Sequence, residues 1–276
     1  MMQLVKLHCL QRFNIKRVLP IMVYLVVYTA VIVLPFRQVA KSYQEMYSYA
    51  LPVLILTSRY YVAFMMIGAI LFYSNLPFKD SFQFWLILKV GYGRWIRSQL
   101  GYIVVSSLAF ILYNLLLMWS MLLPYLQFGF KWGKLTVSMS AGRIPEIQTV
   151  LGNLHFDRVT LDYYMPLQAF VQVIVIWWLV LMVVAFIILV FNLVMKQLGT
   201  LLASGLVVVA LFIEFAAGFW VQYLSPLTWL SIYYIRYEAH SALPTFEQVI
   251  AKLGIALVGL SIGLYYTVKR QGVKIR

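Results

Sequence analysis

Long apolar stretches, separated by shorter polar segments, are the main feature of the chain. A membrane-spanning helix needs about 20 mostly apolar residues, and six stretches have about this length. The pattern therefore predicts an all-α, polytopic membrane protein with one transmembrane domain over residues 1–276. The expected spans are residues 18–36, 50–74, 98–124, 166–194, 200–223 and 249–268.

Residues 77–97 separate the second and third apolar stretches and are rich in aromatic side chains. Asp80 or Ser81 can cap a short helix, and Gly91 and Gly93 are expected to break it. This pattern predicts a short cytoplasmic helix between spans two and three that ends in a bend.

Residues 128–162 form the longest expected outer loop. Within it, residues 134–140 and 155–161 alternate apolar and polar side chains, as half-buried strands do. Ala141-Gly142 has the composition of a turn. We therefore expect a small extracellular cap that contains short strands.

The two connections around the fifth span differ in character. A very short turn around residues 196–199 joins spans four and five, so these spans should be antiparallel neighbours. Residues 220–248 are too apolar for a solvated loop, and Pro226 interrupts them. This pattern predicts a broken helix that re-enters the outer leaflet. Irregular backbone at that depth is tolerated only where protein or water satisfies its hydrogen bonds.

Two charged side chains fall within predicted spans, both near the outer face. An acidic residue within the membrane is costly and usually faces protein or a cavity. Glu214 in the fifth span is therefore a polar contact in a translocation path or a helix-packing partner, unless it already lies at the outer interface. Arg59 in the second span can extend its side chain to the interface. It is also a candidate ion-pair partner for Glu214.

The composition excludes a soluble globule. Of the 276 residues, 63% are hydrophobic and 11% are charged, whereas soluble domains carry about 25% charged residues. So few charges cannot cover a soluble surface, and the apolar excess must face lipid.

The net charge of +14 indicates the orientation of the chain in the membrane rather than binding to nucleic acid. The basic residues lie between and beside the apolar stretches, where they interact with anionic head groups, so membrane lipid is an expected partner and nucleic acid is not. With both termini in the cytoplasm, the inner segments carry about twice as many Lys and Arg residues as the outer loops, as the positive-inside rule requires.

Motifs for catalysis and cofactor binding are missing from the sequence. The chain contains no Gly-x-x-x-x-Gly-Lys-Ser/Thr phosphate loop, no His-Glu-x-x-His and no Gly-x-Ser-x-Gly. Its three histidines lie far apart, without a metal-ligand spacing. We expect this chain to be no enzyme and to hold no metal or cofactor of its own.

Three segments give the chain a resemblance to the membrane-spanning permease subunits of bacterial type-2 ABC transporters, in particular exporters. They are Leu76 to Arg97 between spans two and three, Asn192 to Gly199 between spans four and five, and Leu224-Ser225-Pro226-Leu227-Thr228-Trp229 after span five. The resemblance covers nearly the whole chain and is one of layout and short segments. The loop at residues 128–162 is longer than a minimal family member needs.

The resemblance implies a multi-pass subunit of a bacterial cell membrane that forms a translocation path with a second permease subunit, identical or a sister chain. ATP and Mg²⁺ would bind to a separate ATP-binding subunit. That subunit would dock on the segment between spans two and three, the coupling helix, through Phe82, Phe84, Trp85, Leu86 and Lys89. The outer re-entrant segment would include Ser225, Pro226 and Trp229.

Other functions remain open at this point. A secondary carrier or channel is one alternative, although the chain shows no internal repeat and few polar groups at mid-span. A non-transporting membrane scaffold or sensor is another. For an exporter, the aromatic and apolar composition suits a hydrophobic peptide or lipid-like substrate better than a sugar or an ion.

Overall fold

The computed structural model describes residues 15–77, 81–144, 158–195, 198–216, 225–232, 235 and 243–274, and helices dominate it. The predicted helical class is therefore confirmed. The described strands are the two-residue β1 (Tyr47–Ser48) and β2 (Leu126–Gln127), which pair in parallel.

Four helices are long and apolar enough to cross a membrane, which is typical of a membrane protein. They are α2 (Ile15–Tyr43), α6 (Tyr92–Leu122, continued by the 3-10 helix η1 at Leu123–Tyr125), α10 (Pro166–Met195) and α13 (Phe246–Lys274). Each contains most or all of a predicted span. The helices α2, α6 and α13 extend beyond the predicted limits, because a helix continues past the apolar residues that define a span.

Two of the predicted spans correspond to shorter apolar helices. The predicted second span, residues 50–74, contains two helices, α3 (Leu51–Leu56) and α4 (Arg59–Tyr73). The helix α3 ends because Ser58 is extended, and the Thr57 hydroxyl just before it donates to the carbonyl oxygen of Leu54 at 2.8 Å. The fifth predicted span contains α11 (Leu198–Ala216), and its residues 217–223 lie outside the described residues.

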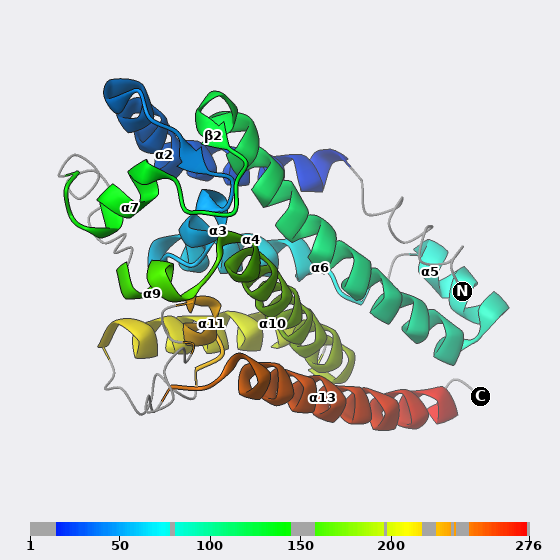
Figure 1. Ribbon diagram of the computed structural model, residues 1–276. Coiled ribbons are helices and arrows are strands. Elements are labelled where there is room, and N and C mark those ends of the chain that lie inside the picture. The colour runs from blue at the N-terminus through cyan, green and yellow to red at the C-terminus, as the bar shows by residue number, and fades with distance from the viewer. Residues whose placement is uncertain are drawn as a thin grey trace.

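The helix α10 is the centre of the bundle. It packs against α13, α11, α6 and α4, and about two thirds of its most apolar stretch is buried (67%), against 22% for α2 and 17% for α13. The helix α2 packs against α4 and α6. Figure 1 shows α13 along one edge of the bundle and α6 crossing it obliquely.

A buried chain of polar side chains joins α2, α4 and α6. The hydroxyl groups of Thr29 and Tyr61 are 3.0 Å apart, and the Tyr61 hydroxyl donates to Oδ1 of Asn114 at 3.2 Å. Asn114 in turn donates through Nδ2 to the carbonyl oxygen of Phe110. Because polar groups buried in an apolar bundle are costly unless paired, this chain specifies how the three helices fit together.

The segments after α6 differ from the predicted strands. Residues 134–140 form α7 (Lys134–Ser140), and residues 158–161 belong to α9 (Arg158–Tyr163), so the prediction of strands was wrong there; residues 155–157 lie outside the described residues. In α7, Leu135, Thr136 and Met139 are buried together on one helical face against α9 and β1. In so short a segment, alternation and helical periodicity look alike, and packing decided between them.

The two ends of the bundle carry different elements. A short helix, α5 (Ser81–Val90), and the last residues of α13 lie at one end, and α7 and α9 lie at the opposite end (Figure 1). At the α7–α9 end, Tyr47 is fully buried, and its hydroxyl donates to the carbonyl oxygen of Phe36 at 3.0 Å. Burial raises the pKa of Tyr47, so it stays a neutral donor.

Candidate functional site

The helix α5 forms where the sequence predicts a short helix, and it has two distinct faces. Leu86, Ile87 and Val90 are half-buried and pack against the core of the bundle. Trp85, Leu88 and Lys89 are exposed, with exposed fractions of 71% for Trp85 and 56% for Leu88. Residues three and four positions apart share a helical face, so these three side chains form one open surface, the α5 face.

The turn between α5 and α6 depends on one glycine. Gly91 has a φ of 83°, a conformation that favours glycine, and its N–H donates to the carbonyl oxygen of Ile87 at 2.8 Å. Gly91 therefore ends α5, as predicted. Gly93 instead continues the first turn of α6, so the prediction that it also breaks a helix was wrong.

Basic side chains lie on the α5 face and in the start of the following helix, α6. Lys89 belongs to the face, and Arg94 and Arg97 are exposed in the first two turns of α6. Arg97 donates through Nε to the carbonyl oxygen of Gly93 at 3.4 Å. The α5 face thus combines two apolar anchors, Trp85 and Leu88, with the positive charge of Lys89, and it suits an apolar groove that carries an acidic residue.

The structure and the sequence reasoning agree only in part on which side chains occupy this surface. Trp85 and Lys89 lie on the α5 face, whereas Leu86 packs against the core. Phe82 and Phe84 belong to α5, but their side chains lie outside the described residues. Leu88 was missed, although its position three residues after Trp85 could have identified it.

A second set of contacts ties the segment before α5 to the turn between α10 and α11. Asn192 near the end of α10 donates through Nδ2 to the carbonyl oxygen of Leu76 at 2.6 Å. Its Oδ1 accepts the N–H of Gly199 at 2.8 Å, and the Thr200 hydroxyl donates to the carbonyl oxygen of Ser74 at 3.2 Å. We call these contacts the Asn192 junction.

Gly199 is the residue that permits the junction. A Cβ atom at this position would lie 2.6 Å from the carbonyl oxygen of Ile188 and 2.6 Å from the backbone nitrogen of Asn192. Glycine is therefore required for α11 to approach α10 this closely. Residues 196–197 of the predicted short turn lie outside the described residues, and the helices on either side of it, α10 and α11, pack together.

The charged residues predicted within spans fall on neighbouring helices. Arg59 lies in the first turn of α4 and is half-buried, and Glu214 lies in the last turns of α11, with its side chain outside the described residues. The helices α4 and α11 pack against each other. An Arg59–Glu214 ion pair stays a prediction.

Of the segment after α11, the structure describes residues 225–232 and 235, and most of these are buried. Ser225 and Trp229 are buried and Pro226 is exposed at a turn, and residues Thr228–Leu230 form the 3-10 helix η2, which packs on α10. The amine of Lys252 in α13 lies 5.1 Å from the centre of the Trp229 ring, a cation–π contact that joins this segment to α13.

Neither a metal site nor a familiar relative identifies the protein. Within the described ranges, no group of three or more His, Cys, Asp or Glu side chains is placed to hold a metal ion. No protein-family model, no curated protein and no solved structure matches the chain.

Proposed function

We propose that the chain is the transmembrane permease subunit of an ATP-driven ABC exporter in the cell membrane. In this proposal α2, α3–α4, α6, α10, α11 and α13 form six crossings, and both termini are cytoplasmic. A second permease subunit completes the translocation path, and a separate subunit binds ATP and Mg²⁺. The observation that carries the proposal is α5 with its open face.

The position and surface of α5 suit docking of a partner subunit. The helix follows the second apolar region and precedes the third, and it lies at the same end of the bundle as the end of α13 (Figure 1). Leu86, Ile87 and Val90 fix one side of it to the bundle. The opposite side presents Trp85 and Leu88; tryptophan is a frequent anchor at protein interfaces, and apolar side chains three positions apart suit docking of a helix in a groove.

The Asn192 junction gives movement of α5 a route into the bundle. Asn192 and Thr200 hold the backbone at Leu76 and Ser74, at the end of α4 and five residues or more before α5, through hydrogen bonds of 2.6 and 3.2 Å. A force on α5 would therefore act on α10 and α11 as well as on the adjoining α4 and α6. Closure of the ATP-binding subunits would in this way shift helices that line the path.

The substrate class follows from the same apolar character. In our proposal the path is lined by apolar and aromatic side chains, which favours a hydrophobic peptide or a lipid-like compound. ATP-driven uptake of such compounds into the lumen of inverted vesicles, without uptake of small sugars or ions, is the expected result. Transport of only small hydrophilic solutes would contradict this part of the proposal.

Affinity purification from native membranes tests the main proposal. We expect the wild-type protein to bring down an ATP-binding subunit, and the Trp85→Ala/Leu88→Ala double variant to lose it. Met165→Ala is the matched control, because Met165 is as exposed as Trp85 (69% against 71%) but precedes α10 near α9. A stable wild-type protein that brings down no ATPase under several mild detergents would overturn the permease proposal. Retention by the double variant would overturn only the role of the α5 face.

A further inference from the structure

The short loop after β2 carries two phenylalanine side chains that are almost fully exposed. Phe128 and Phe130 have exposed fractions of 86% and 87%, the two highest of the large hydrophobic residues that the structure describes. Exposing two large rings to water is costly, since each ring carries a large apolar surface. We therefore expect the two phenylalanine rings to lie in an apolar environment outside the chain.

The loop is held firmly at its base, so the two rings project from a defined position. The N–H of Tyr49 donates to the carbonyl oxygen of Gln127 at 3.0 Å, beside the pairing of β1 with β2. The rings of Tyr49 and Phe128 stack with centroids 5.7 Å apart. On the other side of the loop, a Cβ on Gly133 would lie 2.7 Å from the carbonyl oxygen of Met46, so the two segments are in close contact.

The loop continues an exposed apolar stripe of α6. Exposed side chains recur along this helix and η1 at intervals of three, four or seven residues, which places them on one face. The members of this stripe are Val105, Leu108, Leu112, Leu116 and Leu123. In a membrane-spanning helix such a face lies against lipid, and its last member is only five positions before Phe128.

The length of α6 places the loop at the membrane boundary. Arg97 is the last charged residue at the α5 end of this helix, and Leu123 lies about 39 Å further along the axis at about 1.5 Å per residue. The hydrocarbon core is about 30 Å thick, and membrane helices tilt by up to about 40°. With Arg97 at one boundary, a tilted α6 brings Leu123 to the other boundary, and Figure 1 shows α6 oblique to its neighbours.

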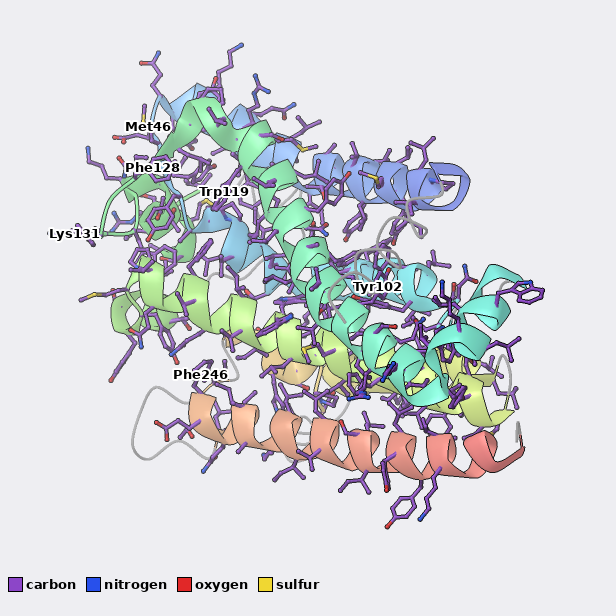
Figure 2. All side chains as sticks on the ribbon, turned by 90° about the vertical axis from the view of Figure 1, so that its right-hand side faces the viewer. Met46, Tyr102, Trp119, Phe128, Lys131 and Phe246 are labelled. Atoms are coloured by element: carbon purple, nitrogen blue, oxygen red, sulfur yellow. The ribbon has the colours of Figure 1, made fainter. Side chains whose placement is uncertain are left out.

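We propose that Phe128 and Phe130 insert into the lipid interface of the leaflet at the α7–α9 end and anchor α6 there. In segments that lie at a membrane surface, Phe, Trp and Leu side chains are the ones that enter the boundary between head groups and acyl chains. The neighbouring Lys131 is exposed, and Figure 2 shows it at the same end of the molecule as Phe128, pointing away from the helices. Its amine is placed for contact with lipid phosphates. The partner of this surface is therefore the phospholipid bilayer.

Site-specific fluorescence tests this insertion in the full-length protein and needs no ATPase. Single cysteines replace Phe128 or Phe130 in a Cys9→Ser background and carry an environment-sensitive NBD label. The protein is reconstituted into vesicles of phosphatidylcholine and phosphatidylglycerol. We expect blue-shifted emission, strong quenching by lipids spin-labelled near the head group, and weak quenching by aqueous iodide.

Two matched positions calibrate the measurement. Leu116→Cys reports the lipid-facing stripe of α6, and Arg143→Cys reports an exposed polar position just after α7. Labels at 128 and 130 that resemble the label at 116 more than the label at 143 support the proposal. Iodide quenching at 128 and 130 as strong as at 143 would overturn it, whatever the outcome for the α5 face.

Discussion

Replacing Gly199 with alanine is the most direct test of the Asn192 junction. The new Cβ would lie 2.6 Å from the carbonyl oxygen of Ile188 and 2.7 Å from Oδ1 of Asn192. Ordinary contacts of this kind are at least about 3.4 Å, so the start of α11 would have to move by about 0.8 Å. The Oδ1 atom of Asn192 accepts the N–H of Gly199 at 2.8 Å, so such a movement would break this hydrogen bond.

The magnitude follows from two costs and one gain. Loss of a hydrogen bond to a buried N–H costs about 1–3 kcal/mol, and overpacking costs a similar amount, about 1–3 kcal/mol. Alanine has a higher helix propensity than glycine, which stabilises the helix by up to about 1 kcal/mol. A net loss of about 3 kcal/mol lowers the midpoint of thermal unfolding by about 6–12 °C for a chain of this size.

Thermal unfolding in detergent, followed by intrinsic fluorescence, measures this change. Gly205→Ala is the control, because it lies in the same helix and a Cβ there would meet nothing within 4 Å. We expect Gly205→Ala to leave the midpoint unchanged or to raise it slightly. Equal midpoints for Gly199→Ala and the wild-type protein would refute the close approach of α11 to α10.

Three side chains within the bundle give further predictions for the same unfolding measurement. Trp178→Phe should cost about 1–2 kcal/mol, because its indole N–H donates to the carbonyl oxygen of Val104 at 3.0 Å. The adjacent Trp177→Phe should leave the stability nearly unchanged, since no partner for the buried indole N–H of Trp177 lies in the described part of the chain. Removing this unpaired N–H is favourable and offsets the cost of the cavity that the smaller ring leaves. A lower midpoint for Trp177→Phe than for Trp178→Phe would contradict both assignments. Tyr61→Phe should cost about 1–3 kcal/mol, as Asn114 loses a donor inside the bundle, and an unchanged midpoint would argue against the polar chain.

Much of the helical layout could be predicted from the sequence. The predicted span at residues 166–194 agrees with α10 to within one residue, and α5 lies where capping and glycine signals placed a short helix. Apolar length and helix breakers are local properties of a chain, so they can be recognised without knowledge of the fold.

The candidate site was predicted less completely, for a physical reason. Trp85 and Lys89 lie on the open face of α5, but which side of a short helix packs against the bundle depends on the neighbouring helices, so Leu88 was missed and Leu86 lies on the packed side. The same holds for residues 134–140, where packing selected a helix over the expected strand.

The sequence by itself determined that this chain consists of long apolar helices, because a bilayer selects for apolar length and a helix satisfies its own backbone hydrogen bonds. The tertiary structure decided how those helices meet. Asn192 bonds to Leu76, which lies 116 positions earlier in the chain, and Tyr61 to Asn114, which lies 53 positions later. Such contacts depend on the relative rotation and depth of neighbouring helices, and apolar periodicity leaves both free because lipid and a packed helix face are similarly apolar.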